Sequence, residues 1–289
     1  MNIIHAGILT LSLFIACEVR YTTIMSIFEA LLLGIIEGLT EFFPISSTGH
    51  LIIAEHLLGI SNPSLFFNIV IQLGAILAVL WIYWKKIIMI IQDFLKSPSV
   101  YATAPKLMFG TIPALLAGFF LNDLIDASQK NIQLVAWMTI IVAFVLLGAE
   151  YIAKKNLLQG KKDGQKSVID YLIIGIFQAI SIIPGVSRSG ITITGGILRR
   201  FSFHDAADTA FLLAVPIMSA ASLFEGLKLM TNPALISAGL GIHTLVAFVA
   251  AFLTAAFTIK ITLPILKKYG FLPFVIYRVL LGIFLLLIL

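Results

Sequence analysis

The sequence predicts an all-α protein that crosses a membrane several times, and three observations support this fold class. First, 60% of the 289 residues are hydrophobic and only 11% are charged, whereas soluble domains are about half apolar and a quarter charged. Second, several long segments are nearly free of charge and approach the roughly 20 residues needed to cross a bilayer. Third, these segments lack the alternating polarity of membrane β-strands, and helices also satisfy their own backbone hydrogen bonds in lipid.

Six segments are predicted to span the membrane, because each is long, apolar and almost free of charge. They cover residues 70–83, 107–121, 132–151, 210–227, 244–259 and 271–289. Arg278 lies inside the last of them, so it either finds a buried partner or snorkels to the interface. The result is an all-α polytopic membrane protein with about three transmembrane helices in each half.

The lysines between the spans predict how the chain is oriented. Most of them fall in three loops, and Lys and Arg favour cytoplasmic loops. The three groups are Lys85, Lys86, Lys96 and Lys106; Lys154, Lys155, Lys161, Lys162 and Lys166; and Lys260, Lys267 and Lys268. We therefore expect residues 154–166 in the cytoplasm and residues 122–131 outside. The formal net charge of +5 is then a topology signal, and no nucleic-acid partner is predicted.

Residues 1–24 are interpreted as an N-terminal extension to a single membrane domain over residues 25–289. A short apolar core at residues 8–16 precedes Cys17, as in a signal-like segment, although no Lys or Arg comes before it. An extra helix and a translation start at Met25 are the alternatives. Cys17 is the only cysteine, which excludes an internal disulfide and a cysteine-built metal site.

The chain contains an internal repeat, in which residues 34–49 align with residues 175–190 without gaps. Each copy is an apolar stretch, a proline break, a Ser/Gly turn and a second apolar stretch too short to span a membrane. Such interrupted segments at matching positions of two halves indicate broken helices that line a site near the membrane midplane.

Re-entrant helix pairs are therefore predicted at residues 25–60 and 168–198. The positions of the lysines place the first pair on the outer side and the second on the cytoplasmic side. With three spans after each pair, residues 25–153 and 168–289 form two inverted-topology repeats.

The first copy carries two acidic residues inside an apolar segment. Glu37 and Glu41 are four residues apart, so a helix projects both carboxylates from one face. A charge inside a membrane segment costs at least a few kcal/mol, so a functional role is the default interpretation. Two hard-oxygen ligands predict a site for Mg or Ca. The alternatives are that one glutamate accepts a proton, or that the pair is solvated at the interface.

Hydroxyl groups and a histidine follow directly, in PISSTGH at residues 44–50. Ser46, Ser47 and Thr48 are suited to cap a new helix, whose free N–H groups also favour phosphate. We predict that these hydroxyls contact a phosphate group. Ser47 and His50 are three residues apart, so the imidazole is expected to orient or deprotonate the hydroxyl.

The second copy supplies a cation. Arg188 has no acidic neighbour in sequence, and its planar fork suits phosphate oxygens. It is also suited to pair with Glu37 or Glu41, and the two roles could alternate as a substrate binds. Three further residues are expected to line the phosphate pocket or to cap its helix. They are Ser187, Ser189 and Thr192.

Both motifs resemble signatures of the undecaprenyl pyrophosphate phosphatase family, also described as bacitracin-resistance proteins. Residues 37–50, EGLTEFFPISSTGH, resemble its acidic first signature, and residues 184–192, PGVSRSGIT, resemble its second. The stretches FLLAVP at 211–216 and LPFVIYR at 272–278 also match. The resemblance thus extends from about Met25 to the C-terminus.

The resemblance implies removal of the terminal phosphate from a polyprenyl pyrophosphate, aided by Mg or Ca, on the outer side of the bacterial cytoplasmic membrane. Glu37 and Glu41 would hold the cation, and Arg188 with the helix-start amides would clamp the pyrophosphate. Ser47 would be the nucleophile with His50 assisting; a phosphohistidine or direct attack by water are alternatives. The implied partners are the lipid substrate and membrane lipid, and the sequence leaves open whether two copies form a homodimer.

A secondary transporter or flippase for an anionic lipid or solute is the alternative function, because inverted repeats and broken helices are its usual architecture. Phosphate release without an ion gradient would indicate the enzyme, and solute accumulation driven by a gradient would indicate the carrier. A structural membrane subunit would leave the buried charges unexplained.

Overall fold

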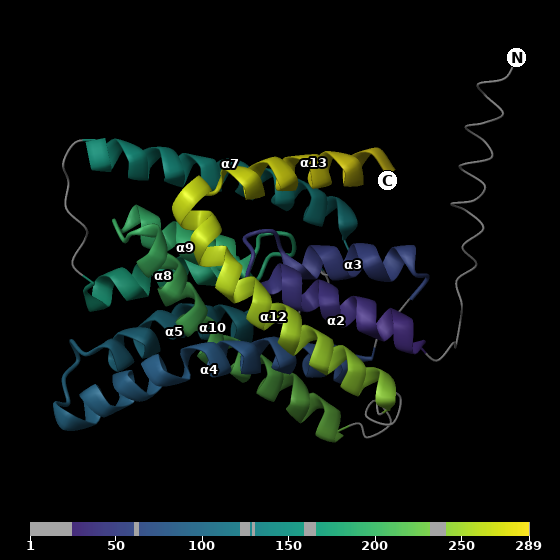
Figure 1. Cartoon of the computed structure of the whole chain (residues 1–289), viewed down its shortest axis with the longest axis horizontal. Coiled ribbons are helices and arrows are strands. Elements are labelled where there is room, and N and C mark those ends of the chain that lie inside the picture. The colour runs from purple at the N-terminus through teal and green to yellow at the C-terminus, as the bar shows by residue number, and fades with distance from the viewer. Residues whose placement is uncertain are drawn as a thin grey trace, which may run out of the picture.

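The computed structural model describes residues 25–60, 64–121, 128, 131–158, 166–231 and 241–288. The regular structure in these residues is helical throughout (Figure 1), as the sequence predicts. The helices are α2 (Ile27–Glu41), α3 (Ser47–Leu57), α4 (Leu65–Lys96), α5 (Thr103–Phe120), α7 (Ile132–Leu158), α8 (Val168–Ile180), α9 (Arg188–Leu198), α10 (Phe203–Thr231), α12 (Ile242–Tyr269) and α13 (Leu272–Ile288). The predicted extension with Cys17, and most of both loops whose sides were predicted, lie outside the described residues.

Five of the described helices are long and apolar enough to cross a membrane. They are α4, α5, α7, α10 and α12. The sixth predicted span, residues 271–289, corresponds to α13, a shorter apolar helix of 17 residues that follows the turn at Gly270. At 1.5 Å per residue it extends about 26 Å, slightly less than the roughly 30 Å hydrocarbon core of a bilayer.

Two short helix hairpins, α2–α3 and α8–α9, occupy the centre of the molecule. They start from opposite ends, and their connecting loops approach each other near the middle (Figure 1). The loops have the same local structure. Ser46 and Ser187 each begin the second helix with a positive φ, of 76° and 74°, and each side chain accepts the N–H of the glycine three residues later. The aligned segments of the sequence therefore adopt matching conformations.

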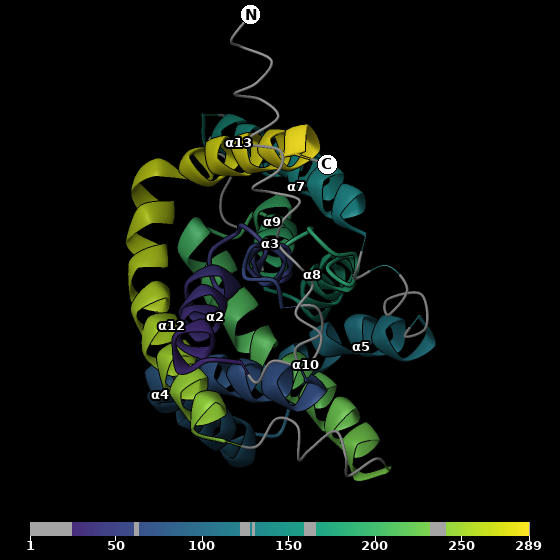
Figure 2. The same ribbon diagram turned by 90° about the vertical axis from the view of Figure 1, so that its right-hand side faces the viewer.

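The remaining helices surround the hairpins in pairs. α2 packs on α12 and α8 packs on α5, while α4 packs on both α12 and α10, and α7 pairs with α13. Viewed along the hairpins, α12 and α5 flank opposite sides (Figure 2). Aligned glycines permit two of these contacts, because Gly34 lies against the backbone of Ala247 and Gly175 against that of Gly110. Each half thus covers the hairpin of the other half.

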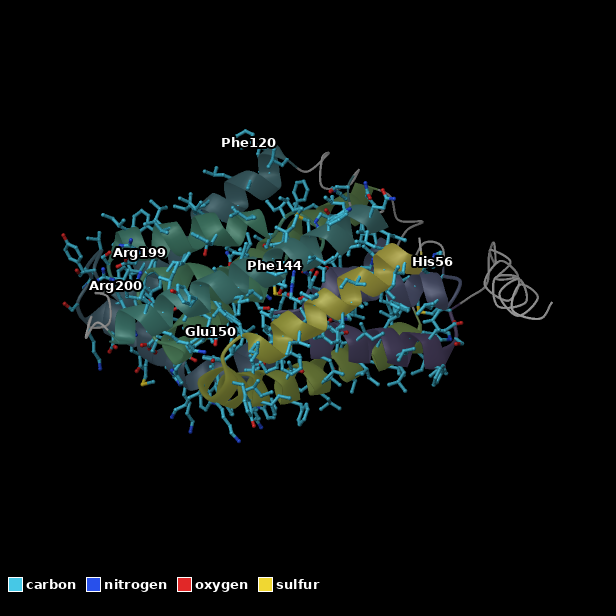
Figure 3. All side chains as sticks on the ribbon, turned by 90° about the horizontal axis from the view of Figure 1, so that it is seen from above. His56, Phe120, Phe144, Glu150, Arg199 and Arg200 are labelled. Atoms are coloured by element: carbon cyan, nitrogen blue, oxygen red, sulfur yellow. The ribbon has the colours of Figure 1, made fainter. Side chains whose placement is uncertain are left out.

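The two ends of the molecule differ in charge. Arg199 and Arg200 lie at one end and His56 at the other (Figure 3). Ion pairs near the arginines join neighbouring helices. They are Arg199 with Asp170 at 2.6 Å, Lys166 with Asp205 at 2.7 Å, and Lys86 with Asp208. We call the end with these ion pairs the basic end.

The tight contact at Gly175 predicts a specific loss of stability. A Gly175→Ala methyl group would meet the Gly110 carbonyl and Pro113, so we expect a loss of about 1–3 kcal/mol from overpacking. Gly148→Ala on α7 adds its methyl group to open space, so it should be neutral or stabilising by up to about 1 kcal/mol. Thermal melting in detergent measures both. Equal melting temperatures for the two variants would contradict this packing.

Candidate functional site

The two loops contact each other at the centre of the molecule. The Ser189 hydroxyl donates a hydrogen bond of 2.8 Å to the carbonyl of Phe43. Gly190 faces Pro44, and a Cβ added to Gly190 would lie 3.1 Å from the Pro44 Cβ. The two motifs singled out in the sequence are therefore brought together, although about half of the chain separates them.

An ion pair joins the two hairpins. Arg188 Nη2 lies 2.5 Å from Glu41 Oε1 and 3.0 Å from the sulfur of Met218. The guanidinium is stacked 5.6 Å from the centre of the Phe42 ring. The Arg188 side chain is 12% exposed and that of Glu41 is 9% exposed, so solvent screens the ion pair little. The predicted pairing of Arg188 with a glutamate is present.

One terminal nitrogen of the Arg188 guanidinium has no hydrogen-bond partner among the described residues. Arg188 Nη1 is buried and forms no hydrogen bond with the residues that the structure describes. A buried, unsatisfied donor costs about 1–3 kcal/mol, and more when the group is charged. Such a donor is suited to an acceptor from another molecule, and an anionic acceptor would form the stronger hydrogen bond.

Glu41 also holds the hydroxyl of Ser47. The Ser47 hydroxyl donates to Oε2, while Arg188 occupies Oε1. The carboxylate therefore contacts both a potential nucleophile and the arginine. Ser47 is the first residue of α3 and Glu41 the last of α2, so the short loop between them creates this contact.

His50 has different partners from those expected. Its Nδ1 lies 2.6 Å from the Ser46 carbonyl, and its Nε2 lies 2.6 Å from the hydroxyl of Tyr277. A carbonyl can only accept, so Nδ1 carries a proton, and in the neutral ring Nε2 then accepts from the Tyr277 hydroxyl. The two rings are stacked with centroids 5.6 Å apart. His50 does not orient Ser47 as expected, because the Ser47 hydroxyl donates to Glu41 and the His50 imidazole bonds Tyr277 of α13.

Glu37 lies one helical turn before Glu41 and is 4% exposed. It forms no hydrogen bond or ion pair with any side chain in the described part of the chain. Within that part, no group of three or more His, Cys, Asp or Glu residues could hold a metal. A cation bound here would thus have at most two carboxylates and would need oxygen ligands from a bound molecule. Mg is commonly bound in this way, by one or two carboxylates together with substrate phosphates.

Most of the other predicted phosphate ligands hold the loops in shape. Ser46 and Ser187 cap α3 and α9, as described above. The hydroxyl oxygens of Ser187 and Ser189 lie 3.3 Å apart, and the Thr192 hydroxyl donates a 2.7 Å hydrogen bond to the Arg188 carbonyl. Thr48 is exposed. The capping alternative therefore describes the serine contacts, and the groups facing each other at the site are Arg188, Glu41 and Ser47.

Two residues of α13 were not predicted as part of the site. Tyr277 contacts His50, and Arg278 is fully buried, with 0% exposure, so it does not snorkel. The only signal in the sequence was an arginine inside an otherwise apolar segment. That signal indicated a need for a partner but did not identify one.

Comparison with known proteins identifies close relatives over nearly the whole described chain. The family model described as bacitracin resistance protein BacA matches residues 30–284. A curated undecaprenyl-diphosphatase of Bdellovibrio bacteriovorus is 39% identical over 269 residues, which cover 92% of this chain and 97% of that protein. An undecaprenyl-diphosphatase of Sulfurovum is 40% identical, and the match covers 92% of this chain and all of that protein. One of Chlorobium phaeovibrioides is 38% identical, and the match covers 92% of this chain and 98% of that protein.

Proposed function

The chain belongs to the bacitracin resistance protein BacA family, and on this premise we propose how its central site works as an undecaprenyl-diphosphatase. It is a multi-pass membrane enzyme that hydrolyses undecaprenyl pyrophosphate to undecaprenyl phosphate and phosphate. The names of the relatives support the phosphatase over the secondary transporter. Recycling of the lipid carrier used in cell-wall synthesis would follow from this reaction.

One observation carries the proposed site. The buried Arg188 uses one nitrogen for Glu41 and leaves the other unpartnered, next to a hydroxyl held by the same carboxylate. The free nitrogen is suited to bind an oxygen of the terminal phosphate. The bound phosphorus would then lie between the arginine and Ser47. Phosphoryl transfer needs mainly such positioning and charge neutralisation.

Ser47 is the nucleophile in the reaction we propose. Glu41 accepts the proton of the Ser47 hydroxyl as Oγ attacks the terminal phosphorus. The bond from phosphorus to the bridging oxygen breaks, and undecaprenyl phosphate leaves with that electron pair. Water then hydrolyses the phosphoserine, phosphate leaves, and the serine oxygen regains a proton from Glu41. His50 is less suited to attack, because its Nε2 lone pair accepts the hydrogen bond from Tyr277.

A divalent cation is proposed to bind with the substrate. Glu37 and Glu41 would be its protein ligands, and pyrophosphate oxygens would complete the coordination shell. When bound, Mg or Ca would neutralise phosphate charge beside the two carboxylates. The unpartnered carboxylate of Glu37 supports this assignment.

We also propose that the two hairpins are re-entrant and that the two halves are inverted-topology repeats. The opposite starting points of the hairpins support this, together with the matching cap geometry. The basic end would face the cytoplasm. The α2–α3 hairpin would then enter from outside, and the site would open to the outer side.

Arg188→Lys tests the phosphate clamp. The lysine keeps the charge but loses the planar guanidinium, so its single ammonium cannot hold Glu41 and a phosphate oxygen in the geometry that two separate nitrogens provide. We expect turnover to fall roughly 100-fold or more, the scale of losing one preorganised stabiliser in the transition state. The measurement is steady-state phosphate release from undecaprenyl pyrophosphate by detergent-purified protein.

The matched control is Arg199→Lys. Arg199 lies at the other end of α9 and pairs with Asp170 at the basic end, outside the site. Its lysine variant should keep near-normal turnover, and melting curves should show both variants folded. Normal turnover in Arg188→Lys would rule out the clamp, and a loss that only follows unfolding would make Arg188 a structural partner of Glu41.

Glu37→Gln tests the cation. The neutral amide is a weaker ligand, so the variant should need a higher Mg or Ca concentration for half-maximal phosphate release. Glu29→Gln on the same helix is the control, because a glutamine still suits its capping box with Ser26. A chelator should abolish the activity of the unmodified enzyme, and added Mg or Ca should restore it. Full activity in chelator would remove the metal from the account.

A further inference from the structure

Arg278 is a buried cation with an unusual set of partners. It lies in α13 with 0% exposure and pairs with no carboxylate in the described part of the chain. Its N–H groups donate to main-chain carbonyls instead. Nε bonds Thr139 at 3.1 Å, Nη1 bonds Pro44 at 3.2 Å, and Nη2 bonds Met138 at 3.3 Å and Gly185 at 2.8 Å.

These carbonyls belong to three separate parts of the structure. Pro44 is in the loop between α2 and α3, and Gly185 is in the loop between α8 and α9. Met138 and Thr139 are on α7. The loop carbonyls lie outside regular helix, and leaving a buried carbonyl without a donor costs about 1–3 kcal/mol. The Arg278 guanidinium therefore supplies a hydrogen bond to a carbonyl of each loop and links both loops to α7.

The two loop contacts lie close to the reacting groups in sequence. Pro44 is midway between Glu41 and Ser47, and Gly185 comes three residues before Arg188. Gly185 also packs closely on α7, because its φ is +90° and a Cβ added to it would lie 2.6 Å from the carbonyl oxygen of Val135. A shift of either carbonyl would change the separation of Arg188 from Glu41 and Ser47.

We propose that Arg278 is a positioning residue of the phosphatase reaction, which keeps the two catalytic loops in register while the substrate is bound. The proposal rests on the proposed function of the central site. The direct ion pair between the hairpins is Arg188 with Glu41, and both of these residues also act on the substrate in the proposed reaction. The hydrogen bonds of Arg278 involve none of the reacting groups, so they hold the loops independently of charge changes at the ion pair.

The test is the kinetics of Arg278→Lys. A lysine keeps the charge, but its single nitrogen cannot reach both loops and α7 in the geometry of the fork. Misplacement of reacting groups by about 1 Å can cost 100-fold in rate. We expect kcat for phosphate release to fall about 10- to 100-fold while KM changes less than about threefold, since lipid contacts remain. Arg278→Gln, which is neutral and still donates to a carbonyl, is the second variant if the lysine protein does not fold.

Leu285→Ala is the matched control. Leu285 is 2% exposed on the same helix, about two turns beyond Arg278, and lies in an apolar cluster with Val135 and Ala136 of α7, but its side chain gives no hydrogen bond to either loop. Its truncation should lower the melting temperature at least as much as Arg278→Lys does. At a temperature below both transitions, it should keep the kcat of the unmodified enzyme.

Three results would contradict the proposal, and they separate it from the proposed function. Unchanged kcat in Arg278→Lys, with Arg188→Lys inactive, would overturn the positioning role and leave the site intact. An equal loss of kcat in Leu285→Ala would make Arg278 a residue of general stability. Unchanged kcat in Arg188→Lys would overturn the site itself, and the positioning role with it.

Discussion

The need of buried backbone groups for hydrogen-bond partners shapes this molecule more than any single contact. A membrane interior offers no water to satisfy free N–H and C=O groups, yet both central hairpins break their helices near the middle of the protein. The breaks persist because side chains supply the missing partners. Ser46 and Ser187 cap the new helices, Ser189 donates to Phe43, and Arg278 donates to Pro44 and Gly185.

The same helix breaks place polar side chains together at the buried central site. Each one ends a helix and starts another in a buried place, so polar groups can be held there without solvent. The formal charges of Glu37, Glu41, Arg188 and Arg278 cancel. A pyrophosphate would add negative charge to this balanced set, and the cation that we propose would offset that charge. Low polarity around these groups also strengthens each electrostatic contact in the transition state.

Much of this arrangement could be predicted from the sequence, because the signals are local. Apolar length predicts the long helices, and the prolines predict the breaks at residues 42–46 and 181–187. Charges inside apolar segments identify Glu41 and Arg188, and their opposite signs predict the pair that is present. The orientation of the halves and the cation remain predictions.

The missed contacts have a common physical cause. His50 bonds Tyr277, which is 227 residues away, and helical spacing carries no information about such a partner. Arg278 was expected either to find a buried partner or to snorkel to the interface, and its partners are main-chain carbonyls. Because every residue has a carbonyl, no residue type in the sequence reveals this kind of acceptor.

We propose that the two hairpins enter the membrane from opposite sides and meet at one site. Cysteine labelling with an impermeant maleimide tests this topology, in a protein in which Cys17 is replaced by serine. His56→Cys lies at the far end of α3 and Arg200→Cys just after α9, and both positions are exposed. With this topology, we expect labelling at position 56 in intact cells, and at position 200 only after the membrane is permeabilised. Labelling of both positions from the same side would contradict it.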